Sequence, residues 1–378
     1  MTTRNPTDDA APRPSAISPR ANAAGPGAPL LLVAFAGVLG GAERVLLDWA
    51  RALERRAVLA CPPGPLAEAA TGFEVVPLRD RPLRRGGRTV AATRDLAALR
   101  RDIVRLVHEH RPAVVVASGQ RPLLAAAWAP RRGAKLLAVQ HDLTATAVLR
   151  VAAARADAIV ATSGAIAQAI DPAGRRLART SVIHPGVEPA AWALPDPLPG
   201  PPRALFLGAL VPWKRADLAL EIAARVPALA LDVAGAPLPG DPADHVDALR
   251  ERAARPDLAG RVRFLGRLDD PRTALAEAHL LLHTADREPF GLALVEALAA
   301  GRPVVAPAAA GPLEIVTPAC GRLYRPGDPH AGAAAVEAVL ADPAAPAAAR
   351  ARAAVFDAPA AARRFAAIVD GLAQGQTP

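Results

Sequence analysis

The segment Asp286–Pro307, with the sequence DREPFGLALVEALAAGRPVVAP, contains the pattern that decides the fold of this 378-residue chain. Pro289 disfavours a helical backbone at Glu288, so the segment is predicted to open as an extended loop. Apolar residues then recur at helical spacing, and Gly301 and Pro303 mark the end of the helix before a short apolar strand. Loop, helix, tight turn and buried strand in this order are typical of one repeat of an α/β sheet.

The chemistry of this segment is predicted to lie at the start of its helix. The unpaired amides after Gly291 attract anions, phosphate above all, and Gly291 has no Cβ to obstruct a ligand. Glu288 precedes the helix, and Glu296 follows eight residues later in the second helical turn. Carboxylates beside a phosphate site repel the phosphate unless they bind hydroxyl groups instead. A ligand with both phosphates and hydroxyls, such as a nucleotide sugar, satisfies both demands.

The two glutamates, set in Glu-Pro-Phe-Gly-Leu and followed by Ala-Ala-Gly-Arg-Pro-Val-Val-Ala, resemble the E-x7-E motif of retaining GT-B glycosyltransferases of the family 4 (group 1) type. The resemblance implies an α/β fold in which two Rossmann-like parallel-sheet domains face a cleft, with a C-terminal helix crossing back to the first domain. It also implies that Glu296 binds the ribose hydroxyls, and that Glu288 and the amides of Phe290, Gly291 and Leu292 bind the transferred sugar. An ordinary amphipathic helix with two solvated carboxylates is the alternative.

The length of the chain and its alternating strand and helix patterns predict two domains, each able to bury its own core. The expected divisions are a disordered tail over 1–28, a first, acceptor-side domain over 29–187, a proline-rich irregular linker over 188–202, a donor-binding domain over 203–345, and a crossover helix and tail over 346–378.

A second glycine-rich loop precedes a helix near the amino terminus. Pro29–Ala36 is predicted to be a buried strand, and a helix is predicted from Ala42 to Leu53. Gly40 and Gly41 lie between them, where loop amides at a helix start are placed to bind phosphate or acceptor. The loop lacks the G-x-G-x-x-G pattern of dinucleotide sites, but it resembles the amino-terminal loop of the same family. A tight turn that merely needs glycine is the alternative.

His141 lies two residues after Val139, where a predicted strand ends. Ligands of open α/β sheets bind at the carboxyl ends of strands. The family carries a histidine at this place, next to the donor sugar, so the resemblance implies a catalytic role for His141 beside Glu288. Ser163 matches the next strand end, where a helix-capping role fits equally well.

Lys214 is the predicted cation of the donor site. Family members commonly place an arginine after the glycine of the preceding strand and a lysine at the Lys214 position, both reaching the donor diphosphate. Lys214 is present and completes the implied catalytic set, but Ala209 stands where the arginine is expected. Either another residue, such as Arg215, replaces it or the donor is held more weakly. Arg267 follows the strand end where the family holds the nucleotide base, so it is a predicted donor-binding residue.

The formal net charge of +9 suits nucleic acid, an anionic membrane or phosphorylated substrates. No basic patch interleaved with aromatic residues accompanies the charge, so a nucleic-acid partner is not predicted. The segment Arg79–Arg88 has five arginines in ten residues. It is predicted to be a surface loop, either solvated or in contact with an anionic acceptor or lipid headgroups.

Cysteine usage and hydropathy indicate the compartment. Cys61 and Cys320 form no C-x-x-C pair, so neither a disulfide framework nor a zinc site is predicted. Residues 1–28 lack the charged start and apolar centre of a signal peptide. No apolar run reaches the roughly 18–20 residues that span a bilayer. These features predict a cytoplasmic protein, with peripheral contact at the inner face of the membrane as the alternative.

The function predicted from these observations is transfer of a sugar, of the hexosyl or mannosyl type and with retention, from a nucleotide-diphosphate donor to a hydroxyl of a saccharide or lipid-linked acceptor. No D-x-D motif occurs, so no metal or other cofactor is predicted, and Lys214, helix-start amides and nearby arginines must stabilise the departing diphosphate. A non-catalytic nucleotide-sugar binding protein, motivated by Ala209, and a glycoside hydrolase using the two glutamates remain as alternatives.

Overall fold

The structure, a computed structural model, describes residues 27–35, 37–79, 89–175, 179–196, 200–238 and 244–376. Most of the tail predicted over 1–28, and nearly all of the arginine-rich segment that begins at Arg79, lie outside these residues. Both predictions therefore remain predictions.

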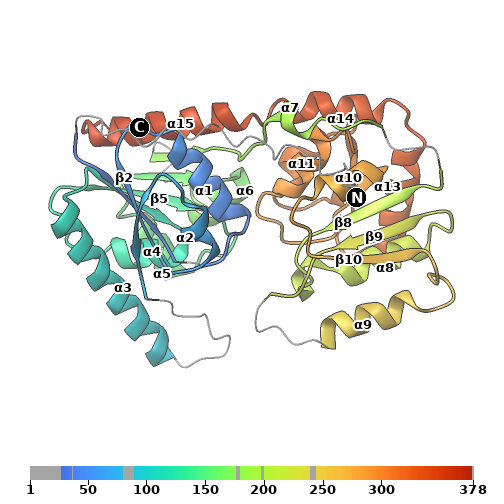
Figure 1. Ribbon diagram of the computed structural model, residues 1–378, viewed down its shortest axis with the longest axis horizontal. Coiled ribbons are helices and arrows are strands. Elements are labelled where there is room, and N and C mark those ends of the chain that lie inside the picture. Colours follow the sequence, from blue (N-terminus) through green and yellow to red (C-terminus); the bar gives the residue numbers. More distant parts are fainter. Residues whose placement is uncertain are drawn as a thin grey trace, which may run out of the picture.

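Two parallel sheets organise the described residues (Figure 1). The first has seven strands in the order β3-β2-β1-β4-β5-β6-β7, and the second has six in the order β10-β9-β8-β11-β12-β13. The strands are β1 (Leu30–Ala34), β2 (Ala57–Cys61), β3 (Glu74–Pro77), β4 (Val114–Ser118), β5 (Lys135–Gln140), β6 (Ala158–Ala161), β7 (Thr180–Val182), β8 (Arg203–Leu207), β9 (Ala230–Ala234), β10 (Val262–Gly266), β11 (Leu280–Leu282), β12 (Val304–Pro307) and β13 (Gly321–Tyr324).

Helices connect successive strands and cover both faces of each sheet. They are α1 (Gly41–Arg51), α2 (Pro65–Ala69), α3 (Thr89–His110), α4 (Gln120–Ala126), α5 (Ala147–Ala153), α6 (Gly164–Ile170), α7 (Pro189–Trp192), the 3-10 turn η2 (Pro212–Lys214), α8 (Ala216–Ala224), α9 (Asp244–Ala253), α10 (Arg272–Glu277), α11 (Leu292–Ala299), α12 (Pro312–Ile315), α13 (Pro329–Leu340), α14 (Ala345–Ala353) and α15 (Ala358–Ala373).

The strands are nearly continuous apolar runs because each sheet is buried on both faces. Successive side chains of a strand point to opposite faces. In β1, Leu31 and Val33 therefore join a core formed with α3, α4 and α5, whereas Leu30 and Leu32 join a second core formed with α1 and α15. The second sheet repeats this arrangement, with α8, α9 and α13 over one face and α10, α11 and α14 over the other. The predicted α/β fold of two Rossmann-like units is confirmed.

The last helix, α15, returns to the first sheet, as predicted. Phe365 stacks on Trp49 of α1 with ring centroids 5.1 Å apart, and Arg55 pairs with Asp370 at 2.8 Å. The chain thus crosses between the two domains twice, first after Val187 and again at Asp357. These two residues form a parallel β-bridge, so the two crossings lie side by side. In Figure 1, α7, α14 and α15 run along the side where the two lobes join.

The connection between the sheets differs from the prediction of an irregular linker over 188–202. Pro189 starts the short helix α7, because proline fits the first helical position, where no backbone donor is needed. Arg302, which is 1% exposed, donates to the carbonyl of Pro195 within the connection at 2.6 Å and to that of Leu275 in α10 at 2.8 Å. A buried guanidinium thus holds the connection at Pro195.

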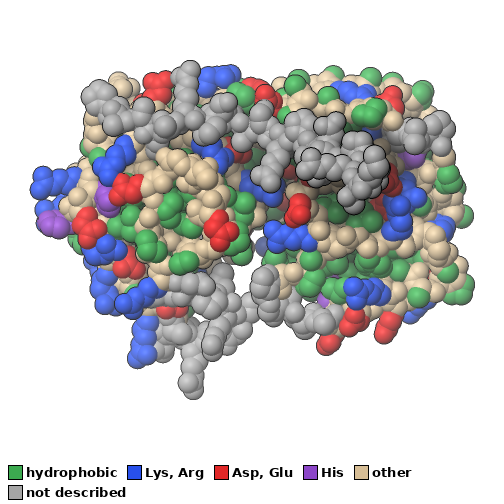
Figure 2. Space-filling model, in the orientation of Figure 1, with side chains coloured by type: hydrophobic (Ala, Val, Ile, Leu, Met, Phe, Trp, Pro, Cys, Tyr) green, Lys and Arg blue, Asp and Glu red, His purple; other side chains and the backbone are tan. Residues whose placement is uncertain are grey.

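Charged side chains are spread over both lobes on the face shown in Figure 2, with acidic groups lying among the basic ones. No helix of the described part of the chain combines the length and the hydropathy required to cross a bilayer.

Candidate functional site

Lys214 and Glu288 meet at the carboxyl end of the second sheet. The Lys214 ammonium forms an ion pair with Oε2 of Glu288, and Nε2 of His283 lies 3.4 Å from the same oxygen. Glu288 is 7% exposed and His283 is 5% exposed. Lys214 ends η2, after β8, and His283 directly follows β11, the strand beside β8. The sheet order therefore brings these three side chains together.

The charges of this cluster are set by burial and by the lysine. Burial alone would raise the pKa of Glu288, but Lys214, His283 and a hydrogen bond from the Phe290 amide lower it below its ordinary value. Burial and the nearby ammonium lower the pKa of His283 to about 4, against the opposing effect of Glu288. At neutral pH the cluster holds a carboxylate, an ammonium and a neutral imidazole.

Gly291 shapes the start of α11. Its φ of 106° lies in the left-handed region, and a Cβ would stand 2.8 Å from the Leu294 side chain and 3.3 Å from Cγ of Glu288. Glycine is therefore required by the backbone itself, in addition to the ligand access expected from the sequence. Among the described residues, the amides of Gly291 and Leu292 donate to no protein acceptor, which leaves them available to an anion.

Phe290 lies between Glu288 and the start of α11. Its ring is 4% exposed and stacks on His184, with centroids 5.5 Å apart. Its amide acts on the Glu288 carboxyl, whose pKa it helps to lower.

Glu296 lies one helical turn further along α11, where the first domain approaches it. Burial raises its pKa to about 7, with Arg44 of α1 lowering the value and Asp270 raising it. Arg44 is exposed and close enough to act on Glu296 across the two domains. A carboxyl that titrates near neutrality can accept hydrogen bonds from hydroxyl groups when it is ionised and can donate one when it is protonated.

The predicted phosphate loop also reaches this place. Gly40 precedes α1, and its amide donates to the Glu43 carboxylate at 3.0 Å, so that amide is used within the helix cap. A Cβ on Gly41 would lie 4.0 Å from Leu292, the first residue of α11. The starts of α1 and α11 therefore face each other across the domain boundary.

His141 follows β5. The neighbouring strand β6 ends beside the loop that carries Glu288. The Nε2 of His141 is 3.3 Å from the Ser118 hydroxyl, and burial lowers the pKa of this histidine to about 4, so the ring is neutral at physiological pH. The neighbouring strand β6 leads to Ser163, whose hydroxyl donates to the Pro289 carbonyl at 2.7 Å. Ser163 also accepts from the amide of Ile166, so it performs the helix-capping role as well.

The cation expected beside Lys214 is not supplied by Arg215. That guanidinium pairs with Asp217 at 3.0 Å and with Asp286 at 3.1 Å. Ala209 offers no charge, so Lys214 is the cation that the loop after β8 presents to the cluster. The Lys214 ammonium also lies 4.4 Å from the ring centroid of Trp213, an exposed side chain whose position the sequence pattern did not single out.

Arg267 follows β10 and is exposed. It stands on the carboxyl edge of the second sheet, as predicted, but the contacts do not join it to the Lys214–Glu288 pair. The described residues also contain no group of three or more His, Cys, Asp or Glu side chains arranged to hold a metal ion.

Sequence reasoning missed one pair at the site altogether. His184 Nε2 lies 2.8 Å from Oε2 of Glu314, and the two residues come from different domains. The histidine follows β7 and the glutamate lies in α12, 130 positions later. No local pattern could have joined them.

Comparisons with known proteins identify the family of this chain. Residues 196–355 match the family described as Glycosyl transferases group 1, and residues 39–191 match Glycosyltransferase Family 4. Over 190 residues, the chain is 35% identical to D-inositol 3-phosphate glycosyltransferase of Mycolicibacterium paratuberculosis, covering 47% of this chain and 43% of that protein. It is 35% identical over 195 residues to glycogen synthase of Mycobacterium tuberculosis, covering 48% and 44% of the two chains. The matched region thus spans less than half the length of these relatives.

A solved structure matches nearly the whole molecule. The crystal structure of HepE from Anabaena in complex with UDP-glucose superposes with a TM-score of 0.78 at 26% identity, covering 91% of this chain and all of HepE. The two family matches together run from residue 39 to residue 355, and the structural match covers 91% of the chain. These findings lead to one conclusion. This chain belongs to the group 1 glycosyltransferases of the family 4 type and has their two-domain GT-B architecture.

Proposed function

We propose that this chain transfers a sugar, with retention and without a metal ion, from a nucleotide-diphosphate donor to an acceptor hydroxyl. The observation that carries the proposal is the Lys214–Glu288 pair at the start of α11, with Glu296 one turn away. An ammonium and free helix amides suit a diphosphate, and two carboxylates suit sugar and ribose hydroxyls.

Each site residue has a role in this proposal. Lys214 and the amides of Gly291 and Leu292 bind the diphosphate and stabilise the charge that develops on it as it leaves. Glu288 binds hydroxyls of the transferred sugar, and Glu296 binds the ribose. Neutral His141, on the first domain, hydrogen-bonds the sugar without adding charge.

The proposed reaction needs no protein nucleophile. The acceptor oxygen forms a bond to the anomeric carbon on the face from which the diphosphate departs. The bond between that carbon and the phosphate oxygen breaks, and the acceptor proton passes to the departing oxygen. The two domains contribute by orienting the reactants and excluding water.

The donor and acceptor classes are part of the proposal. HepE has been crystallised with UDP-glucose, so UDP-glucose is the first donor to test. The acceptor is proposed to be a saccharide or a lipid-linked hydroxyl reached from the cytoplasm, with peripheral contact at the inner membrane face.

The test is a thermal-shift screen against UDP-glucose, UDP-N-acetylglucosamine, GDP-mannose and ADP-glucose, run with EDTA present. One donor class is expected to stabilise the wild-type protein, and Lys214→Ala and Glu296→Ala are expected to lose most of that shift. Equal shifts in all three proteins would contradict the site assignment. Turnover is then measured as nucleotide release that requires an acceptor, and the anomeric configuration of the product decides whether the configuration is retained.

One observation favours a second candidate, a non-catalytic nucleotide-sugar binding protein. Ala209 lacks the expected cation, and Arg215 is engaged by Asp217 and Asp286. Tight donor binding with no nucleotide release on any acceptor in a saccharide and polyprenyl-lipid panel would support this candidate over a transferase.

A further inference from the structure

The first domain holds the loop that carries Glu288. Ser163 follows β6, and its hydroxyl donates to the carbonyl of Pro289 at 2.7 Å while accepting from the Ile166 amide at 3.2 Å. The proline is the next residue after Glu288. A side chain of the first domain is therefore bound to the backbone of the donor loop, defined here as residues 288–291.

A second contact crosses between the domains close by. Glu314 of α12 accepts hydrogen bonds from the amides of Gly164 at 2.8 Å and Ala165 at 3.0 Å, which are the first residues of α6. His184 supplies a third contact at 2.8 Å. Burial alone would raise the pKa of Glu314, but these hydrogen bonds lower it, so the carboxylate is ionised at neutral pH.

The helix that carries Glu314 is joined directly to the donor loop. The amide of Gly311, just before α12, donates to the Glu288 carbonyl at 3.0 Å. Arg352 fixes the other side of the helix, donating to the carbonyls of Ile315 at 2.8 Å and Glu314 at 2.6 Å. The helix α12 is therefore held to the donor loop on one side and to Arg352 on the other.

The loop is thus held from both domains at adjacent carbonyl groups. Its Glu288 carbonyl is bound from the second domain, and its Pro289 carbonyl is bound from the first. Ser163 and Glu314 direct their hydrogen bonds to protein groups, so neither is needed for direct contact with a ligand.

We propose that Ser163 and Glu314 are positioning residues through which the first domain sets the conformation of the donor loop. The binding of the donor by Lys214, Glu288 and Glu296, which all lie on the second domain, then depends on contact between the domains, in addition to the hydrogen bond proposed for His141 of the first. The inference rests on the proposed function, because it concerns the same donor site.

The experiment uses the full chain in four variants. Ser163→Ala removes the hydroxyl, and Ser163→Thr retains it. Glu314→Gln keeps the shape of the side chain but turns an amide NH2 group toward backbone N–H donors. Glu337→Gln, at an exposed position of α13, is the matched control for loss of one carboxylate.

Affinity is measured by calorimetry for each member of the nucleotide-sugar panel. Ser163→Ala and Glu314→Gln are each expected to weaken donor binding about tenfold, the value of roughly one charge-assisted or well-placed hydrogen bond. Ser163→Thr and Glu337→Gln are expected to bind as the wild type does. In a turnover assay, the KM for the donor is expected to rise and the KM for the acceptor to stay unchanged. A general loss of folded protein would lower the rate without changing the KM for the donor alone.

Hydrogen exchange supplies a readout that does not depend on activity. Both weakened variants are expected to exchange faster at the donor loop and at the amides of Gly164 and Ala165, with α8 and α13 unchanged. Wild-type affinity in both variants, or faster exchange throughout the second domain, would overturn the inference alone. Failure of the wild type to bind any donor in the panel would instead overturn the proposed function, and the inference with it.

Discussion

The ammonium of Lys214 is paired with the carboxylate of Glu288, 74 positions away in the chain. Each group is thereby satisfied by the other in the free protein, and both are proposed to bind the donor. A nucleotide sugar can replace both interactions, because its diphosphate binds the ammonium and its hydroxyls bind the carboxylate. A nucleoside diphosphate replaces only one and leaves a largely buried carboxylate without its counter-charge.

Glu288→Gln is therefore expected to change the relative affinities for donor and product. Removing the carboxylate frees Lys214, so UDP should bind several-fold more tightly, whereas UDP-glucose should bind about tenfold more weakly because it loses a charged hydrogen-bond acceptor. Calorimetric titration with both ligands measures the ratio, and Glu337→Gln serves as the control. If the affinities for UDP and UDP-glucose change in the same direction, the ion pair does not discriminate between the two ligands.

Lys214→Met is expected to destabilise the protein on the order of 2–3 kcal/mol, because it leaves Glu288 buried without its partner. The side chains are 18% and 10% exposed, so water relieves part of that cost. Urea unfolding measures the change. Adding Glu288→Gln to the lysine variant is expected to recover at least half of the loss, and no recovery in the double variant would argue that the lysine stabilises the fold through packing alone.

Glu296 is expected to make stability depend on pH near neutrality. Its pKa rises from the usual 4.5 to about 7 in the folded chain, so the folded state binds the proton more tightly than the unfolded state. Its contribution to stability is therefore full below pH 4.5 and is lost as the pH rises through about 7, by at most about 3 kcal/mol. Glu296→Gln should remove this loss, as measured by the difference in unfolding free energy between the two proteins from pH 5 to pH 8. A difference that stays constant over this range would contradict the raised pKa.

Gly311→Ala is expected to displace the donor loop. A Cβ at this position would stand 2.2 Å from the Phe290 carbonyl oxygen, and backbone atoms cannot yield cheaply. Donor affinity should fall at least tenfold. Gly200→Ala is the matched control, because a Cβ there meets no atom within 4 Å. Unchanged donor binding in the Gly311 variant would mean that the loop conformation is not critical to the donor.

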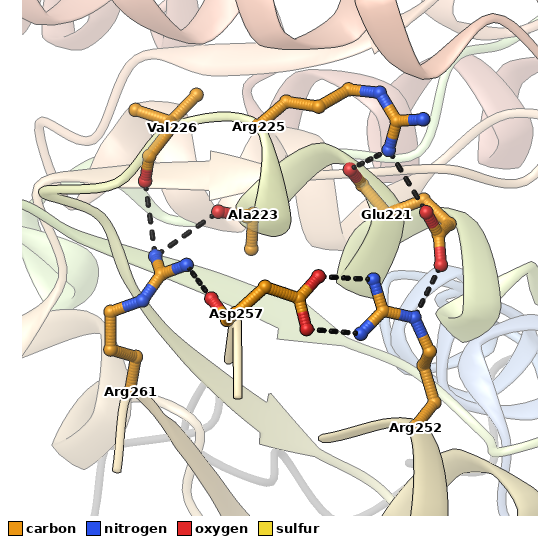
Figure 3. A network of polar contacts seen from close by, with 7 residues as sticks. All are labelled: Glu221, Ala223, Arg225, Val226, Arg252, Asp257 and Arg261. Atoms are coloured by element: carbon orange, nitrogen blue, oxygen red, sulfur yellow. Dashed lines mark hydrogen bonds and ion pairs between the residues drawn. The ribbon is translucent and has the colours of Figure 1, made fainter. Parts of the chain in front are cut away.

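Arg261 is expected to stabilise the second domain through a fixed guanidinium geometry (Figure 3). Its Nη1 donates to the carbonyls of Ala223, Val226 and Leu229 at 3.1, 3.1 and 2.7 Å, which satisfies acceptors at and after the end of α8. Lysine keeps the charge but not the planar fork, so Arg261→Lys should cost about 2 kcal/mol.

The matched control for Arg261 is Arg255→Lys, at an exposed arginine of the same connection. Chemical denaturation of the two variants gives the comparison. Equal stability of both would indicate that water replaces the Arg261 contacts without loss.

Local sequence patterns were enough to predict most of the fold. The helix predicted from Ala42 to Leu53 is α1, Gly41–Arg51, and α11 begins and ends where Gly291 and Gly301 place it. These predictions succeed because helical periodicity, apolar runs and the backbone preferences of glycine and proline act over a few residues. Boundaries without such markers were less accurate, and the strand predicted over Pro29–Ala36 extends only from Leu30 to Ala34.

The sequence itself also determined where the two glutamates lie relative to the helix. Glu288 precedes α11 and Glu296 lies in its second turn, because only eight positions of loop and helix separate them. The tertiary structure alone decided that Lys214 pairs with Glu288, that Arg215 is held by Asp286, and that Glu314 binds the start of α6. The last two contacts join residues 71 and 150 positions apart. Lys214 and Arg215 meet Glu288 and Asp286 because the sheet order places β8 beside β11, whereas Glu314 meets α6 only when the two domains come together. No local preference of the backbone encodes either meeting.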